Sequence, residues 1–461
     1  MADDFAAYVM HGANLAEGRP YTAIHFIPNP DAMWLAPAQG YPPVYPLLLA
    51  PVYKLYGLNL KAMKILTVSC FGIFLIAYVL LIERVLPLWA RLAAIVLVGF
   101  NAAFWEQRNY LLSEFPYLMF SFCALLVAQR VYRDLDPRRW RLPSAVGLAV
   151  LVYCAYGTRT IGIALLFALI LADLLKNKRP SNFLIAVTAF TMLLIALQTV
   201  TIISPRSYLD AVHLSAGAIS QHAVYYGKTL SYVWLNGFSK MAQIAFALLF
   251  TALAGIGFIR KIWDRQSACA FYLLIHLAIL IAWSAEIGLR GLLPLLPLYF
   301  SYALEEISRT LAPLGRAIRW ATITALCAVV VMTYLGAFRH GRHEAHLLDV
   351  QDQSAKEVFA FLQANTQPSD VLVFPKPRTL ALFTNRNVAA LALEETPAQA
   401  LGFLRGIHAK FLVESKSIAG PMQYLTGSHT IDLTEIFHNA DFQVYRINLR
   451  DGSPAPPKSA E

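Results

Sequence analysis

An acidic pair stands at the start of the chain. Asp3 and Asp4 precede a polar and aromatic run, and a stretch rich in proline and tyrosine, YPPVYPLLLAPVYKLY, begins at Tyr41. A carboxylate can accept the proton of an attacking hydroxyl group, because that hydroxyl becomes acidic in the transition state. The pair is therefore a candidate general base, and Tyr41 is a further candidate site residue. The structural alternative is a frayed terminus or the N-cap of a helix.

Two arginines lie beside apolar stretches. Arg159 occurs in AYGTRTIGI and Arg290 in SAEIGLRGLLPLLPLYF. An arginine side chain presents a fork of donors that suits phosphate oxygens, although an arginine at the end of a membrane helix can also extend to the interface. A carboxylate at a helix start favours the helix dipole even without a role in chemistry. Three weaker candidates complete the set, namely Arg108, Glu114 and Glu286.

Metal and disulfide chemistry have little support in the sequence. His340, His343 and His346 have a spacing that could place imidazoles on one face of a helix. No carboxylate or cysteine pattern accompanies them, so a solvated run beside the membrane is favoured and no metal site is predicted. The cysteines fall in apolar stretches without a CxxC pair, which indicates buried thiols. They are Cys70, Cys123, Cys154, Cys269 and Cys327.

The elements that must position these residues are membrane helices. The 461 residues include 57% apolar or aromatic types and only 14% charged types, whereas a soluble domain carries about 25% charged residues. This composition excludes a soluble enzyme and a disordered scaffold. An α-helix of about 20 apolar residues crosses the hydrocarbon core of a bilayer. Ten apolar segments predict such helices: 65–84, 89–105, 112–130, 143–157, 160–175, 183–203, 240–259, 268–284, 290–306 and 317–338.

The basic residues predict the orientation of these helices. Alternate connections hold sixteen Lys and Arg in one set and six in the other. Because basic loops stay in the cytoplasm, the first set is predicted to be cytoplasmic, including 130–141 and 260–265. The loop 204–239, the N-terminal stretch and everything after 339 then lie outside. The basic loops thus account for the net charge of +10, and no nucleic-acid partner is expected.

Four regions follow from these patterns. Residues 1–64 are read as a first extracytoplasmic loop with the acidic pair, and 65–338 as the transmembrane helical domain. Residues 339–450 are read as a small extracytoplasmic α/β domain and 451–461 as a flexible tail. The α/β prediction for residues 339–450 rests on helical runs that alternate with strand-like runs. The helical runs are Ala355–Gln363 and Pro397–Leu404, and the strand-like runs are Asp370–Phe374, Lys410–Val413 and Phe442–Ile447.

This arrangement resembles the GT-C class of membrane glycosyltransferases, which includes the protein mannosyltransferases of glycosyltransferase family 39 and the aminoarabinose transferases of lipid A. The runs RNYLLSEFPY, TRTIG and LRGLLPLLPLYF look like elements of these families in the same order, and an outer C-terminal domain is common in them. The similarity covers most of the chain. The first-loop motif is carried by Asp3, Asp4, Tyr8, Asn14–Tyr21 and Tyr41–Gly57.

The resemblance implies an inverting transfer of a sugar from a polyprenyl-phosphate donor, undecaprenyl or dolichyl, to an acceptor outside the cytoplasm. The acceptor would be a lipid, a glycan or a protein, and the protein would reside in the cell (inner) membrane as part of envelope synthesis. Either Asp3 or Asp4 would be the base, and Arg159 and Arg290 would bind the donor phosphate. No cofactor is implied with certainty; the need for a divalent cation, the sugar, the acceptor and the oligomeric state stay open.

Two rival interpretations share the apolar composition and the aromatic loops. A carrier or flippase for lipid-linked sugars should place ionisable residues near the bilayer midplane and show paired half-structures. Here the charged residues lie near segment ends and no repeat is visible, which favours the enzyme. An inactive relative that acts as an assembly partner is separated from the enzyme only by an assay.

The resemblance also places the acidic pair just after a first transmembrane helix. We therefore expect the reading frame before Met1 to encode a basic stretch and about 20 apolar residues, one more span than the ten counted above. The alternative is an N-terminus translocated by segment 65–84. The charges on the two sides of that segment, Lys54, Lys61 and Lys64 against Arg84 and Arg91, give such an insertion little help.

Overall fold

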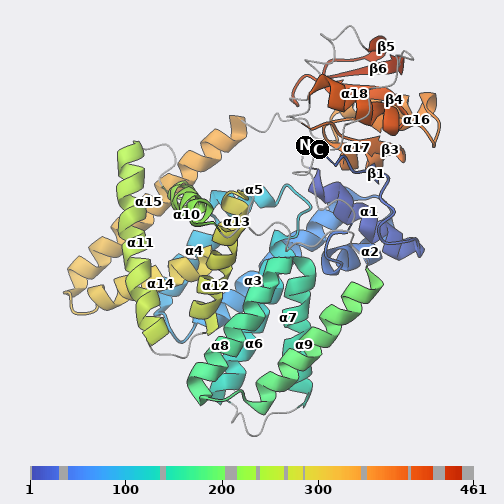
Figure 1. Cartoon of the computed structure of the whole chain (residues 1–461). Coiled ribbons are helices and arrows are strands. Elements are labelled where there is room, and N and C mark those ends of the chain that lie inside the picture. Colours follow the sequence, from blue (N-terminus) through green and yellow to red (C-terminus); the bar gives the residue numbers. More distant parts are fainter. Residues whose placement is uncertain are drawn as a thin grey trace. The chain divides into compact units, whose positions relative to one another are not determined.

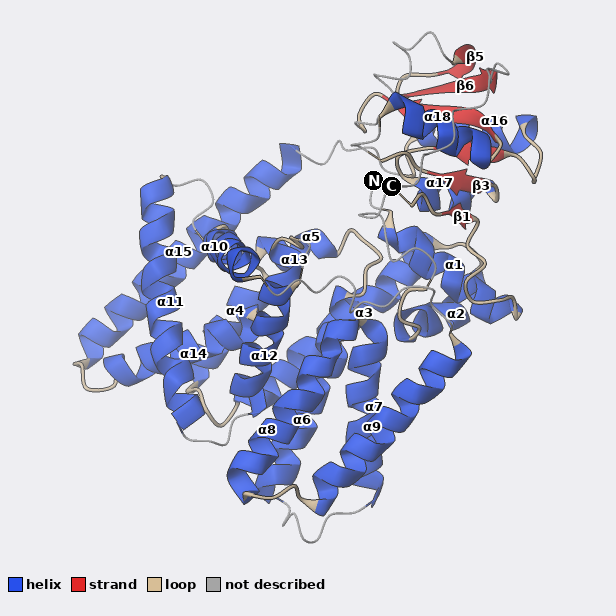
Figure 2. Cartoon of the chain, viewed as in Figure 1, coloured by secondary structure: helices blue, strands red, loops and turns tan. Residues whose placement is uncertain are grey.

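A computed structural model of the chain describes residues 3–30, 40–134, 142–202, 215–234, 239–263, 268–283, 286–343, 350–392, 396–418 and 431–448. The chain divides into two compact units. The first combines Met1–Asn14 and Gly18–Tyr41 with His346–Glu461, and the second contains Leu15–Glu17 and Pro42–Ala345. Helices make up the described part of the second unit, whereas the strands belong to the first (Figures 1 and 2).

The second unit consists of helices that follow one another along the sequence (Figure 1). They are α2 (Val44–Tyr56), α3 (Leu60–Ile82), α4 (Leu88–Gly99), α5 (Ala102–Gln107), α6 (Glu114–Asp134), α7 (Leu142–Thr158), the 3-10 turn η3 (Thr160–Gly162), α8 (Ile163–Asn177), α9 (Asn182–Thr201), α10 (Ala216–Ser231), α11 (Lys240–Trp263), α12 (Ala268–Ala282), α13 (Leu289–Leu292), α14 (Leu296–Leu311) and α15 (Arg316–His343). Each of the ten predicted apolar segments is largely helical.

Within the described part of the chain, six helices are long and apolar enough to cross a membrane. They are Leu60–Ile82, Glu114–Tyr132, Thr160–Asn177, Asn182–Thr201, Lys240–Ile262 and Arg316–Gly336. The apolar helices α4, α7 and α12 have only 12, 17 and 15 residues. At 1.5 Å per residue they reach about 18 to 25 Å, less than the roughly 30 Å of a hydrocarbon core. The count of ten spans therefore stays a prediction.

The helices pack through aromatic and small side chains. Tyr78 of α3 donates a hydrogen bond to the carbonyl of Pro297 at 2.8 Å, which ties α3 to α14. On α11, a Cβ at Gly257 would lie 2.5 Å from the carbonyl oxygen of Tyr302, so only glycine permits this approach to α14. In α9, α11 and α15, by contrast, no more than 22% of the most apolar window is buried. These faces are left for lipid to cover.

The first unit contains a six-stranded sheet in the order β1-β3-β2-β4-β6-β5. The strands are β1 (Phe26–Ile27), β2 (Val371–Val373), β3 (Asn387–Ala389), β4 (Ala409–Ser415), β5 (Asp432–His438) and β6 (Phe442–Asn448). The pairs among β1, β3, β2 and β4 are parallel, and β6 pairs antiparallel with both β4 and β5. Four helices accompany the sheet: α1 (Asp4–Glu17, whose last three residues group with the other unit), α16 (Gln353–Asn365), α17 (Pro377–Thr384) and α18 (Pro397–Gly406).

One strand of this sheet comes from the N-terminal region. Phe26 is in register with Val388, and Ile27 with Ala389, so β1 extends the C-terminal sheet at its edge. Residues 1–64 were predicted to be a first extracytoplasmic loop, and within them the structure has the helices α1 and α2 (Val44–Tyr56) besides β1. A strand of two residues is too short to show the alternation of apolar and polar residues from which strands are predicted. The sequence also predicted neither the three-residue β3 nor the longer α17 and β5, which have eight and seven residues. The predicted tail, 451–461, lies outside the described residues.

Candidate active site

Asp3, the first residue of the acidic pair, binds the start of a second helix, α17. Asp3 is the N-cap residue of α1 but makes no side-chain cap there. Its Oδ1 instead accepts a hydrogen bond of 3.0 Å from the backbone N–H of Thr379, in the first turn of α17. The first N–H groups of a helix lack partners within it, and a carboxylate satisfies them and the positive end of the helix dipole. Only 8% of the Asp3 side chain is exposed.

Arg378, the residue before Thr379, joins the two aspartates to Tyr41. Its Nη1 donates to the Tyr41 hydroxyl at 2.7 Å and lies 3.3 Å from Asp4 Oδ1, and its Nε lies 3.7 Å from Asp3 Oδ2. The Tyr41 hydroxyl in turn donates to Asp4 Oδ1 at 2.8 Å. We name Asp3, Asp4, Tyr41 and Arg378 the Arg378 cluster; all four belong to the first compact unit.

Burial shifts the pKa of two members of this cluster, Asp3 and Tyr41. It raises the pKa of the Asp3 carboxyl, an effect that Arg378 and the Thr379 N–H only partly offset. Burial also raises the pKa of the Tyr41 hydroxyl well above its ordinary value, so Tyr41 stays a hydrogen-bond donor to Asp4. The Arg378 guanidinium lies over the rings of Phe26 and Tyr41, 5.2 and 5.3 Å from their centres. Asp4 is the more accessible carboxylate, with 37% of its side chain exposed.

A buried histidine fixes the backbone beside Tyr41. His11 Nδ1 lies 2.7 Å from the carbonyl oxygen of Tyr21, and the Tyr41 N–H points to His11 Nε2 at 3.5 Å. This pattern requires a neutral ring with its proton on Nδ1. Burial lowers the pKa of His11 from 6.5 to about 4, which agrees with the neutral form. His11 thus supports the position of Tyr41 without being in the cluster itself.

A second cluster lies in the helical unit. Glu114, the first residue of α6, has 1% of its side chain exposed. Its Oε1 lies 2.7 Å from Arg159 Nη1 and also 2.7 Å from Arg290 Nε. We name these three residues the Glu114 cluster. One buried carboxylate therefore holds together the two arginines that the sequence analysis selected separately.

Glycines shape the turns that carry these arginines. Arg159 lies between α7 and η3, and a Cβ at Gly162 would approach the backbone of Ala155 to 2.6 Å, so the turn closes tightly only with glycine there. Arg290 lies in the one-turn helix α13, which begins after Gly288 with φ of 68°. That left-handed conformation favours glycine. The local sequence therefore sets the backbone from which both arginines reach Glu114.

Three buried polar residues adjoin the Glu114 cluster. The Tyr117 hydroxyl, one turn after Glu114 on α6, lies 2.9 Å from the Tyr272 hydroxyl and 3.3 Å from His276 Nδ1, both on α12. His276 also hydrogen-bonds the backbone of Gly291, the residue after Arg290. The network thus ties α6, α12 and α13 together. A histidine inside the apolar run FYLLIHLAIL was a signal that the sequence analysis missed.

The other candidates have different surroundings. Arg108 lies over the ring of Trp105, 4.0 Å from its centre, and Glu286 is exposed. Across the described ranges, no group of three or more His, Cys, Asp and Glu side chains could hold a metal ion. The prediction about His340, His343 and His346 concerns side chains outside the described residues.

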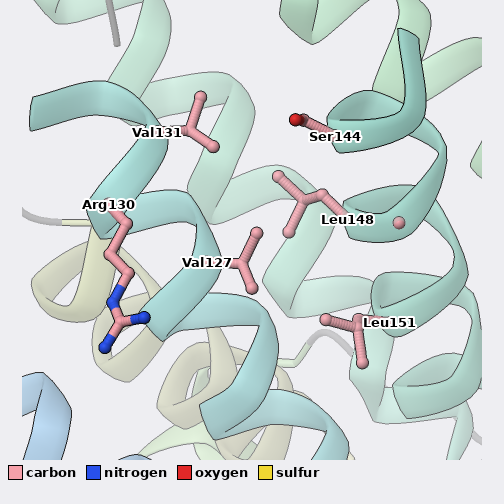
Figure 3. A pocket seen from close by; sticks show the side chains of 7 residues that line it. Val127, Arg130, Val131, Ser144, Leu148 and Leu151 are labelled. Carbon is pink, nitrogen blue, oxygen red and sulfur yellow. The ribbon is translucent and has the colours of Figure 1, made fainter. Parts of the chain in front are cut away.

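An apolar groove lies between α6 and α7. Val127 and Val131 of α6 face Leu148 and Leu151 of α7 across it, and Ser144 lies at the α7 side (Figure 3). Arg130 also lines the groove, but its guanidinium points away from these apolar side chains (Figure 3). Apart from Arg130, the groove is therefore lined by apolar side chains, Ser144 and Gly147.

The chain resembles known proteins in structure rather than in sequence. No family model matches it, and no curated protein matches it in sequence. Among solved structures it is similar to ArnT from Cupriavidus metallidurans bound to undecaprenyl phosphate, with a TM-score of 0.56 and 14% identity over 99% of this chain and 95% of that one. For apo ArnT the TM-score is 0.58 with 12% identity, over 97% of this chain and 93% of that one.

An archaeal structure shows the same likeness. The oligosaccharyltransferase of Archaeoglobus fulgidus, in complex with Zn and sulfate, matches with a TM-score of 0.57 and 12% identity, over 90% of this chain and 64% of that one. At these identities the likeness establishes the fold. The chain has the GT-C fold, as the sequence predicted, and is an integral membrane protein.

Proposed function

We propose that this protein is a glycosyltransferase that moves a sugar from a polyprenyl-phosphate donor to an acceptor hydroxyl with inversion. In this proposal it works in the cell (inner) membrane with its active site on the extracytoplasmic side, and the acceptor is a lipid, a glycan or a protein. The observation that carries the proposal is the Glu114 cluster, in which Arg159 and Arg290, far apart in sequence, meet at one buried carboxylate. The GT-C fold supports it, since ArnT, to which the chain is similar, binds undecaprenyl phosphate in its structure.

The Glu114 cluster suits a departing lipid phosphate. The two guanidinium groups carry two positive charges and Glu114 one negative charge, which leaves one formal positive charge. When the bond between the sugar and the phosphate breaks, the phosphate gains negative charge that arginine donors stabilise. Side-chain exposures of 19% for Arg159 and 36% for Arg290 leave both accessible to a headgroup. Glu114 holds the arginines in place before the donor arrives.

The Arg378 cluster supplies the base. The acceptor oxygen attacks the anomeric carbon of the sugar, the carbon–oxygen bond to the phosphate breaks, and the hydroxyl proton passes to a carboxylate of the acidic pair. A single displacement of this kind inverts the anomeric centre. Tyr41 holds the carboxylate of Asp4 through a hydrogen bond.

The test is a transfer assay with purified protein in liposomes. A panel of radiolabelled polyprenyl-phosphate sugars is offered with candidate acceptors, and acceptor-dependent release of the lipid phosphate is measured. At least one donor should be turned over, and Arg290→Ala should suppress the turnover. Movement of an intact lipid-linked sugar between leaflets without any release would instead establish a carrier.

A further inference from the structure

We propose that Asp4 is the base of the acidic pair and that Arg378, from α17 of the C-terminal sheet region, is the positioning residue that holds it. Asp3 then has a structural task, which is to attach the start of the chain to α17. This assignment rests on the proposed glycosyl transfer, and it selects between two aspartates that the sequence leaves equivalent.

The two aspartates differ in accessibility and in their partners. Asp3 has 8% of its side chain exposed, and its Oδ1 is occupied by the Thr379 N–H at 3.0 Å. A base must be reached by the hydroxyl that it deprotonates, within about 2.6 to 3.2 Å. Asp4 has 37% of its side chain exposed and can be approached by an acceptor. Accessibility therefore selects Asp4.

Arg378 is held rigidly enough to position another side chain. Only 2% of the residue is exposed, and the rings of Phe26 and Tyr41 lie against its guanidinium. Its Nη1 contacts Asp4 Oδ1 directly and also through Tyr41, whose hydroxyl receives a hydrogen bond from Arg378 and donates one to the same oxygen. Two donors on one carboxylate oxygen restrict the rotamers of Asp4. Catalytic geometry held in this way can be lost by a displacement of about 1 Å.

A purely structural role for Arg378 is the competing explanation. Removing one partner of a buried ion pair strongly destabilises a fold, whether or not the pair serves catalysis. The same unit offers a matched control in Arg386, which is also buried and donates hydrogen bonds to Thr366 and to backbone carbonyl groups. Loss of Arg386 should disturb the unit without touching the acidic pair.

The experiment combines a double-mutant cycle with this control in the full-length protein. Asp3→Asn, Asp4→Asn, Arg378→Gln, Arg378→Lys, Arg386→Gln and the Asp4→Asn/Arg378→Gln double variant are reconstituted in liposomes. Turnover is measured with the donor of the polyprenyl-phosphate panel that the parent protein uses best. Thermal unfolding of each variant is measured in detergent, which tests the contact between Asp4 and Arg378 even if no donor of the panel is used.

We expect Asp4→Asn to lower kcat about 100-fold or more, the usual scale for a lost general base. Arg378→Gln should lower kcat about 10- to 100-fold at nearly unchanged donor KM, and Arg378→Lys should recover part of the loss, which are the scales expected for misplaced catalytic groups. The double variant should be no worse than Asp4→Asn alone, because Arg378 acts through Asp4. Arg386→Gln should lower the unfolding temperature with little change in kcat for the protein that remains folded.

Several results would overturn the assignment. Multiplicative effects in the double variant, or no coupling between Asp4 and Arg378 in thermal unfolding, would reduce Arg378 to a structural residue. Loss of turnover in Asp3→Asn with full turnover in Asp4→Asn would reverse the two aspartates. Full turnover in both aspartate variants would remove the acidic pair from the proposed function itself, while the thermal cycle would still report whether Arg378 holds Asp4.

Discussion

At the scale of single residues, the two arginines of the Glu114 cluster should control use of the donor. Removing a charge-assisted hydrogen bond to phosphate costs about 1.5 to 3 kcal/mol, or roughly 10- to 150-fold. Arg159→Ala and Arg290→Ala should each lower kcat/KM for the lipid donor by about this factor. The control is Arg91→Ala, since Arg91 lies outside the Glu114 cluster and forms a long ion pair of 3.9 Å with Glu83. Equal effects of all three substitutions would argue against phosphate binding.

His11 should make the stability of the first unit depend on pH. Its folded-state pKa of about 4 lies below the ordinary 6.5, so the unfolded chain binds the proton more readily. The stabilisation is complete above pH 6.5 and is lost progressively as the pH falls towards 4, by up to about 3 kcal/mol for a fully buried ring. Unfolding followed between pH 7 and 4.5 should be less sensitive to pH in His11→Gln. Asp3, with its raised pKa, acts in the opposite direction in both proteins.

At the scale of elements, Glu114 connects α6 with the turn before η3 and with α13. Glu114→Gln keeps the shape of the side chain but leaves two guanidinium groups facing each other without a counter-charge. We expect a lower unfolding temperature together with weaker donor use, because the arginines should separate. The partial exposure of both arginines reduces the cost below that of a fully buried pair. Glu83→Gln, at a longer pair in which the Glu83 side chain is 52% exposed, is the matched control; an unchanged unfolding temperature in Glu114→Gln would contradict the connection.

The network around Tyr117 should stabilise the same group of helices. Tyr117→Phe removes the hydroxyl between Tyr272 and His276, both of which are buried. A buried polar group that loses its partner costs about 1 to 3 kcal/mol. The unfolding temperature in detergent should therefore decrease clearly for Tyr117→Phe but hardly at all for Tyr232→Phe, because Tyr232 is 62% exposed. Similar results for both would mean that the network contributes little.

At the scale of the whole molecule, the orientation in the membrane can be tested with single cysteines. Ser220 and Ser369 are exposed and lie in regions predicted to face outward, whereas Lys178 is exposed in a region predicted to be cytoplasmic. In a background without the five native cysteines, Ser220→Cys and Ser369→Cys should react with an impermeant thiol reagent on intact cells. Lys178→Cys should react only after permeabilisation. Protection of both serine positions would reverse the orientation and the side proposed for the active site.

The sequence by itself determined the class of molecule. Hydropathy is a property of local composition, so the ten apolar segments could be located, and each is largely helical. The GT-C resemblance came from short motifs in order, and the fold agrees with it. The lengths of α4, α7 and α12 were less predictable, because a polar side chain or a glycine turn ends a helix without changing the average hydropathy around it.

Only the tertiary structure decided which charged side chains contact one another. Arg378 and Asp4 are 374 residues apart, and Glu114 and Arg290 are 176 residues apart. No local pattern marks Arg378 in KPRTLAL as a partner of the N-terminus, because an arginine in the first turn of a short helix reads as an ordinary surface residue. Its partners are fixed by β1, which adds the N-terminal region to the C-terminal sheet through backbone hydrogen bonds that any residue can form. A contact of that kind depends on the fold of both segments, so the sequence of either segment alone does not predict it.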